Sequence, residues 1–300
     1  MKVTIKNLFY GTMVTLSDDP TEFVYVLEEV DWGNATANFT EASNAKGYGT
    51  KITYTAYTMR DMAITGWLVA EETDLVNGWK TVEDLKDKLN RLINPSHDLE
   101  VICKKYKIKC RAATSIKYSV DYRYNNEILV KFVIDLRASY PFFTYVNPDV
   151  ITDSHVEGGL MFPWEIPLDE GGDMFGFVPE NNLTFIKNMG DIDAGFLLVC
   201  TAKWGDARDI EVINNRTGQF ISIDIDLIEG DILKISTVTQ DKFATLEREG
   251  VVEDITKYVL RGSEFWQLSP GNNDISIRMV NSTNMFYELT YVPGFMEVLQ

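Results

Sequence analysis

Short stretches in which apolar and polar residues alternate run through most of the chain, and they constrain its fold more than any other feature. Residues 51–58 read KITYTAYT and residues 220–227 read FISIDIDL. A period of two puts alternate side chains on opposite faces of a β-strand. The segment 118–136 predicts a hairpin, with strands 118–124 and 128–136 joined by a turn at Asn125-Asn126. The sequence therefore predicts a mainly β protein.

One segment departs from this pattern and predicts a helix over residues 81–93. Leu85, Leu89 and Leu92 recur at helical spacing and share one face. Thr81 precedes them as an N-cap with acidic residues in the first turn, and Asn94-Pro95 ends the run.

Length and charge divide the chain near residue 146. Three hundred residues suit two domains, and the stretch from 141 to about 180 is rich in turn residues, with five of the nine prolines. Residues 1–146 carry a net charge of −1 and residues 147–300 carry −16. We therefore expect an N-terminal β-rich domain with one helix over 1–146 and a second domain over 147–300, each meeting different partners.

The overall charge of −17 disfavours simple binding to nucleic acid phosphates or anionic lipid. No apolar run follows the charged start, and no window approaches the ~18 apolar residues of a membrane span. The three cysteines, at 103, 110 and 200, lack metal-like spacing and are expected to be reduced thiols. We expect synthesis in a cytoplasm and no membrane partner.

Catalytic motifs are absent from the sequence. No phosphate loop, dinucleotide fingerprint, HExxH or GxSxG motif occurs, and His97 and His155 are the only histidines. Asp224 and Asp226 fall on one face of the strand predicted at 220–227. A glycoside hydrolase could use such a pair, but a solvated sheet face explains them more simply. We predict no catalytic, cofactor-binding or metal-binding residues.

Residues 104–111 form the most basic stretch of the chain. Read as a strand, Lys105, Lys107, Lys109 and Arg111 share one face, opposite Tyr106, Ile108 and Cys110. We call these four cationic residues the basic strip. Lysines often guard an exposed strand edge against aggregation; alternatively the basic strip meets an acidic neighbour or a passing polyanion.

The second half contains a series of phrases that resembles a known family. In order, they are Phe162–Pro167 (FPWEIP), Phe175–Phe177 (FGF), Ile186–Gly195 (IKNMGDIDAG), Ile213–Asp224 (INNRTGQFISID), Ile228–Ile235 (IEGDILKI) and Phe265–Ile275 (FWQLSPGNNDI). In this order and spacing they resemble the distal tail protein (Dit) family of long-tailed bacteriophages, the siphophage tail components. The ending LRASYPFF at 136–143 is similar to the closing strand of the first domain in that family.

This resemblance implies a structural role with no enzyme activity and no cofactor. In the family, the N-terminal domain assembles into a ring, usually a hexamer, and a C-terminal galectin-like β-sandwich projects from it. The ring joins the tail tube protein to the tail-tip protein and often anchors receptor-binding or side-fibre proteins. The expected location is the tail tip of a virion or of a phage-tail-like particle, including one encoded by a prophage. The basic strip is then expected at the ring lumen or at a subunit contact.

A second class of function stays open at this point. A galectin-like sandwich with exposed aromatic side chains could be a carbohydrate-binding module for host surface glycan. Trp204 or Trp266 would have to lie on an exposed face to stack on a sugar ring.

Overall fold

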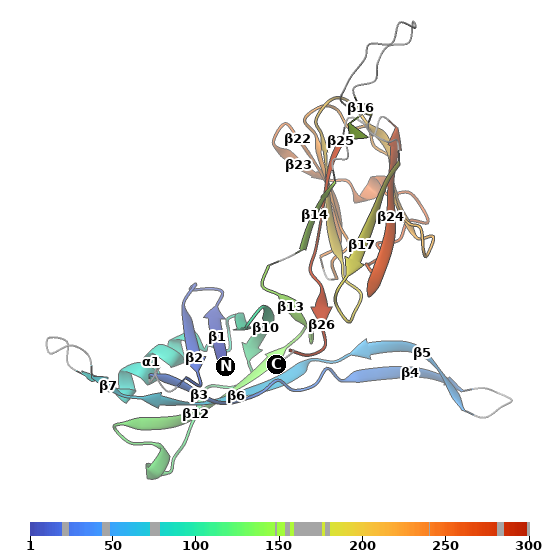
Figure 1. Ribbon diagram of the computed structural model, residues 1–300. Helices are drawn as coiled ribbons and strands as arrows, with labels where there is room; N and C mark the ends of the chain where they lie inside the picture. Colours follow the sequence, from blue (N-terminus) through green and yellow to red (C-terminus); the bar gives the residue numbers. More distant parts are fainter. Residues whose placement is uncertain are drawn as a thin grey trace, which may run out of the picture. The chain divides into compact units, whose positions relative to one another are not determined.

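The computed structural model describes residues 1–19, 24–43, 49–72, 79–147, 149–153, 157–158, 176–177, 181–239, 241–280 and 285–298. The protein is mainly β, as predicted, and divides into two compact units (Figure 1). Unit 1 comprises Met1–Val146 and Phe295–Gln300, and unit 2 comprises Asn147–Gly294. The division made from sequence put 295–300 in the second domain; they group with the first because Phe295 and Val298 are buried in its core. His155 and the phrase at 162–167 lie outside the described residues.

Unit 1 is built on a sheet that closes on itself. Its order is β12-β6-β3-β2-β1-β9-β10, and β10 pairs back onto β12 through Arg111↔Arg137 and Ala112↔Leu136. These strands are β1 (Lys2–Asn7), β2 (Met13–Ser17), β3 (Tyr25–Asp31), β6 (Arg60–Val69), β9 (Leu99–Cys103), β10 (Tyr106–Ala112) and β12 (Leu129–Ala138). The sheet also includes β11 (Lys117–Tyr118), β13 (Phe143–Tyr145) and β26 (Gly294–Phe295).

Alternation along the strands fills the interior of this closed sheet. In β12, Val130, Phe132, Ile134 and Leu136 are buried, and the residues between them are partly exposed. The β10 strand repeats the pattern, since Tyr106, Ile108, Cys110 and Ala112 are all buried. Period-two patterning thus produces a single apolar core in unit 1.

The predicted helix is confirmed as α1 (Val82–Leu92). The Thr81 hydroxyl accepts a hydrogen bond from the Asp84 backbone N–H, and the Asp84 carboxylate accepts one from the Thr81 N–H, which forms a capping box. Leu85, Leu89 and Leu92 are buried together with Val82. No helix among the described residues is long and apolar enough to cross a membrane.

The chain returns to unit 1 at its C-terminal end and is held there by Arg60. This arginine is 1% exposed. Its guanidinium donates to the Met296 carbonyl and, at 3.4 Å, to the Trp32 carbonyl, and it lies 4.7 Å from the centre of the Phe143 ring. The Phe295 ring packs 5.2 Å from Tyr106 and 4.6 Å from Tyr145, measured between ring centroids. The last turn of the chain is therefore part of the unit 1 core.

The predicted strand at 118–124 is wrong, although its partner is confirmed as β12. Strand β11 stops at Tyr118 and is followed by the 3₁₀ turn η1 (Tyr122–Tyr124). The Asp121 side chain accepts a hydrogen bond from the Arg123 backbone N–H at 3.0 Å, which caps the turn. This local bond competes with strand pairing.

Two small pairs of strands complete unit 1. They are β4 (Ala37–Ser43) with β5 (Thr50–Tyr57), and β7 (Glu71–Glu72) with β8 (Trp79–Lys80). The β4–β5 hairpin is a two-stranded sheet of its own, and it extends away from the closed sheet of the same unit (Figure 1).

Unit 2 is a sandwich of two antiparallel sheets, as the galectin-like resemblance implies. One sheet has the order β14-β25-β18-β21-β22-β23 and the other β17-β24-β19-β20. The strands are β14 (Asp149–Asp153), β17 (Asn181–Asn188), β18 (Phe196–Ala202), β19 (Arg208–Asn214), β20 (Phe220–Ile223), β21 (Ile232–Ser236), β22 (Phe243–Arg248), β23 (Val251–Asp254), β24 (Gly271–Val280) and β25 (Met285–Tyr291). A separate pair, β15 (Glu157–Gly158) with β16 (Gly176–Phe177), and the 3₁₀ turn η2 (Thr256–Tyr258) complete it. Buried side chains of both sheets form one core.

One ion pair at the edge of this core has a buried carboxylate and a partly exposed guanidinium. The Asp231 side chain is 2% exposed and accepts hydrogen bonds from Arg248, the shortest at 2.6 Å from Nη2 to Oδ2. Burial alone would raise the pKa of Asp231, but the hydrogen bonds from Arg248 and from the Ile228 backbone N–H outweigh it and hold the pKa below its usual value. The pair fixes the turn between β20 and β21 to the end of β22.

Replacing Arg248 by methionine is expected to lower the free energy of unfolding of unit 2 by about 1–3 kcal/mol, because the buried Asp231 carboxylate then keeps only the hydrogen bond from the Ile228 N–H. The matched control is Lys257→Met. It removes an exposed pair with Glu253, 3.0 Å from Nζ to Oε1, and should leave the free energy of unfolding almost unchanged because solvent screens that pair. Calorimetric unfolding of the full chain measures both.

The effect of Arg248→Met should also depend on pH. Because the folded-state pKa of Asp231 is lowered, its stabilising contribution is present above the pKa of an unfolded aspartate, about 4, and is lost as the pH falls through the folded value. The stability gap between wild type and Arg248→Met should therefore shrink in acid. A gap that is constant down to about pH 2 would contradict this account.

Candidate assembly surfaces

Three of the four residues of the basic strip lie on one face of β10, and Lys105 does not. Lys107, Lys109 and Arg111 point outward, opposite the buried face of the strand. Lys105 lies in the tight turn between β9 and β10, where Lys104 adopts a φ of 54°. Strand β10 pairs with β9 on one side and with β12 and β13 on the other, so it is not an edge strand. The interpretation of these lysines as guards of an exposed edge is therefore wrong.

Acidic side chains of the neighbouring strand neutralise part of the basic strip. The Lys107 Nζ lies 3.2 Å from Glu100 Oε1. Asp98 forms salt bridges with both of the other cations: Lys109 Nζ lies 2.8 Å and Arg111 Nε 2.5 Å from its carboxylate oxygens. The hydrogen bond from Lys109, followed by that from Arg111, lowers the pKa of Asp98. Lys105 instead donates to the Tyr145 hydroxyl at 3.4 Å.

Asp98 and Glu100 were not among the residues predicted for this surface, although the alternation of acidic and apolar residues at 98–103 indicates them. They alternate with Leu99, Val101 and Cys103, so they face the same way as the cations once β9 and β10 are read as one hairpin. Three cations, Lys107, Lys109 and Arg111, and two anions leave this face with a net charge of +1.

The two tryptophans named for glycan binding have opposite environments. Trp266 is 3% exposed and packs 4.8 Å from Phe196 between ring centroids, so it offers no face to a sugar and that assignment is wrong. Trp204 is exposed between β18 and β19, with Lys203 Nζ 5.8 Å from its ring centre. The same Nζ lies 4.2 Å from the Phe286 ring centre.

The candidate carboxylates lie beyond the strand predicted to carry them. Strand β20 ends at Ile223, and both Asp224 and Asp226 are exposed after it. The Asp224 N–H donates to the Tyr258 carbonyl at 3.0 Å, and the Asp226 carbonyl accepts from Arg248 at 3.0 Å. Both of these hydrogen bonds are made by main-chain atoms of the two aspartates, not by their carboxylates. Within the described part of the chain, no three His, Cys, Asp or Glu side chains gather as metal ligands could. The three cysteines are buried free thiols, as predicted.

The β4–β5 hairpin is the most unusual surface of unit 1, and sequence patterning did not reveal it as one. Its strands pair from Ala37↔Tyr57 to Ser43↔Thr50, and almost all of its side chains are exposed on both faces. Ile52 and Tyr54 lie on one face and Phe39 on the other, each more than half exposed. The alternation in 51–58 is therefore genuine, but no core lies beneath it.

A second exposed apolar feature follows β1, at the turn that contains Leu8, Phe9 and Tyr10. The fully buried Asn7 fixes this turn: its Oδ1 accepts from the N–H groups of Phe9 and Tyr10 at 2.9 and 3.1 Å, and its Nδ2 donates to the Leu92 carbonyl at 2.8 Å. Phe9 stacks on His97 with ring centroids 4.7 Å apart. Unit 1 thus presents aromatic side chains to solvent on a rigid backbone.

Comparison with known families gives a match that covers most of unit 2. Residues 189–295 match the family of the siphovirus-type tail component, C-terminal domain. A comparison with curated protein sequences finds no match.

Similar solved structures cover nearly the whole chain. The crystal structure of the SPP1 Dit protein (gp 19.1), described as a paradigm of the hub adsorption apparatus in phages that infect Gram-positive bacteria, has a TM-score of 0.63 and 12% sequence identity, over 98% of this chain and 99% of that one. The phage P2 baseplate in its activated conformation with Ca has a TM-score of 0.48 and 11% identity, over 97% of both chains. At such identity, the likeness to SPP1 Dit shows the fold. Residues 189–295 thus match the siphovirus-type tail component, C-terminal domain, and the chain has the fold of SPP1 Dit, which confirms the predicted resemblance to the distal tail protein family.

Proposed function

We propose that this protein is a structural hub of a phage tail tip, in which copies of the chain form a hexameric ring. The ring joins the tail tube to the tail-tip protein and anchors receptor-binding or fibre proteins. Unit 1 builds the ring, and unit 2 carries the peripheral partners. The observation that supports the ring is the β4–β5 hairpin, which is uncovered on both faces within its own chain.

An uncovered hairpin of this kind needs a partner for stability. A two-stranded hairpin is at best marginally stable in water, and exposed strand edges with apolar side chains favour pairing with another chain. Burial of side chains such as Phe39, Ile52 and Tyr54 stabilises a docked hairpin by about 25 cal/mol per Å² of apolar surface. A hairpin that docks on a different face of the next copy makes a heterologous contact, and such contacts generate closed rings.

The charge distribution supports the same division of roles. Residues 1–146 have a net charge of −1, so copies of this region can pack side by side with little mutual repulsion. Residues 147–300, with −16, suit a well-solvated peripheral arm. We also place the basic strip, together with Asp98 and Glu100, at the ring lumen or at a subunit contact.

Ring formation is tested by light scattering on a sizing column across a concentration series. The wild-type mass should approach six times 34.2 kDa, with a central pore visible by electron microscopy. The double variant Ile52→Ser/Tyr54→Ser should associate at least tenfold more weakly, because each buried apolar anchor contributes roughly 1–2 kcal/mol to an interface. Both side chains are exposed in the single chain, so unfolding should be unchanged.

The matched control is Val251→Ser/Val252→Ser on β23. These valines are exposed to a similar degree but belong to unit 2, and the ring should persist in this variant. A wild-type monomer at every concentration, and also with tail tube and tail-tip proteins added, would contradict the proposed function.

A test of where the basic strip lies requires a variant that preserves its local ion pairs. In Asp98→Lys/Lys109→Glu/Arg111→Glu, the pairing survives with reversed signs, and the net charge of these three residues changes from +1 to −1. We expect normal unfolding and ring association weakened by about tenfold or more, as for close charge pairs at interfaces. Unchanged assembly and unchanged joining to the tail tube would rule out this placement of the basic strip.

The exposed side chain of Trp204 favours one alternative, a carbohydrate-binding module for host surface glycan. If the wild type stays monomeric, a glycan array becomes the deciding experiment. Glycan binding that disappears in Trp204→Ala would support the alternative, and an array without any binding would exclude it.

A further inference from the structure

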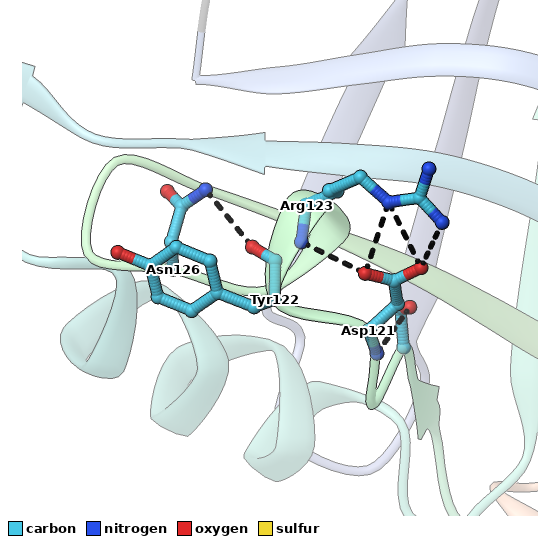
Figure 2. A network of polar contacts seen from close by, with 5 residues as sticks. Asp121, Tyr122, Arg123 and Asn126 are labelled. Atoms are coloured by element: carbon cyan, nitrogen blue, oxygen red, sulfur yellow. Dashed lines mark hydrogen bonds and ion pairs between the residues drawn. The ribbon is translucent and has the colours of Figure 1, made fainter.

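The segment between β11 and β12, residues 119–128, is a loop held rigid by its own polar side chains; we call it the 119–128 loop. Figure 2 shows Asp121 and Arg123 in a fork-like pair, with Arg123 Nη2 2.8 Å and Nε 3.2 Å from Asp121 Oδ2. The Arg123 backbone N–H also donates to Asp121 Oδ1, at 3.0 Å. The two charges of this turn therefore neutralise each other and fix the direction of η1.

Two asparagines hold the rest of the loop. Asn126 Oδ1 accepts from the N–H groups of Ile128 and Leu129, both at 3.0 Å, and its Nδ2 donates to the Tyr122 carbonyl at 3.4 Å (Figure 2). Asn125 Nδ2 donates to the Ser119 carbonyl at 2.7 Å, and its Oδ1 accepts from Lys86 Nζ of α1 at 3.1 Å. The loop is thus tied both to itself and to the helix.

This rigid loop exposes apolar side chains rather than burying them. Tyr122 is 81% and Ile128 is 67% exposed, and both border a hollow of about 740 Å³ between the loop and the start of α1. Ala70, Val82, Glu83 and Lys86 also line the hollow. Aromatic and aliphatic side chains that are already fixed around a concavity lose little conformational entropy on binding. Such side chains are also common in the centres of protein interfaces.

Charge and position indicate which partner fits. The loop carries Asp121, Arg123 and Glu127, which with Glu83 and Lys86 of the hollow give a net charge of −1. The strands of the β4–β5 hairpin carry one acid, Glu41, and one base, Lys51. Both surfaces are therefore nearly neutral, with exposed apolar side chains. Figure 1 places β4 and β5 at one end of unit 1 and α1 at the other. One copy thus presents a protruding hairpin at one end and a hollow at the end opposite it, as head-to-tail association requires.

We propose that the 119–128 loop and its hollow receive the β4–β5 hairpin of a second copy of this chain. This inference rests on the proposed function, because it names the contact that propagates the ring. Tyr122 and Ile128 form the rim that meets the apolar face of the hairpin at Ile52 and Tyr54. Each subunit then contributes one hairpin and one receptor, so every contact in a closed ring is satisfied.

Complementation between two defective variants tests this pairing. The hairpin variant, Ile52→Ser/Tyr54→Ser, keeps its loop intact. The loop variant, Tyr122→Ser/Ile128→Ser, keeps its hairpin intact. Each should be monomeric alone at a concentration where the wild type forms rings. Mixed in equal amounts, they retain one intact hairpin and one intact loop that can meet, so the expected product is a 1:1 dimer with twice the mass of 34.2 kDa, and no ring.

Controls separate this inference from loss of folding and from failure of the ring itself. Val120→Ser alters the most exposed apolar side chain of the same loop, one that does not line the hollow, and should leave the ring intact. Unfolding midpoints should match among all variants. A loop variant that still forms wild-type rings overturns the pairing, as does a mixture that stays monomeric, and in both cases the ring and the proposed function stand. A wild type that never assembles, even with its tail partners, overturns the proposed function and this inference together.

Discussion

The buried guanidinium of Arg60 determines how the two ends of the chain are combined into one domain. It donates to the Met296 carbonyl near the C-terminus and to Trp32 near the N-terminus, and burial lowers its pKa while the charge of Glu297 partly offsets that effect. Burying a charge is costly unless it is hydrogen-bonded, and the Met296 carbonyl accepts one of the hydrogen bonds of Arg60. The C-terminal segment is therefore a structural requirement of unit 1. The chain leaves unit 1 after β13 and returns through β26, which are neighbours in the same sheet, so unit 2 is an insertion into unit 1.

This arrangement suits a protein whose two parts have different tasks. The chain leaves and re-enters unit 1 on two paired strands, β13 and β26. The first and last long strands of the inserted sandwich, β14 and β25, also pair with each other, through Asp149↔Tyr291. Each unit has its own apolar core. Unit 1 is left with the apolar groups that its own fold does not cover, at the β4–β5 hairpin, at the turn after β1 and at the 119–128 loop. These surfaces are the ones that the proposed ring would use for contacts with copies of this chain and with other tail proteins.

Local patterns in the sequence predicted the elements whose stability is local. Helix α1 was predictable because its apolar spacing and the Thr81 cap act within one segment, and β12 because its alternation continues into a buried face. The alternating pattern predicted the wrong structure where hydrogen bonds from side chains to the backbone determine the local conformation. Asp121 and the asparagines after it bond to the backbone and turn a predicted strand into a loop. Alternation gives the faces of a strand but not what covers them, so the exposed hairpin and the burial of Trp266 could not be read from it.

Hydrogen exchange measured by mass spectrometry, on the full chain and on a chain that ends at residue 294, tests the central claim most directly. Without its C-terminal segment, unit 1 loses the partner of Arg60 and the ring that packs on Tyr106 and Tyr145. The account predicts that amides of β6, β10 and β13 exchange much faster in the shortened chain, whereas those of β18, β21 and β25 in unit 2 keep their protection. Phe295→Ala in the full chain should give the same pattern in weaker form. Equal protection of unit 1 in both chains would contradict the claim that the C-terminus completes that domain.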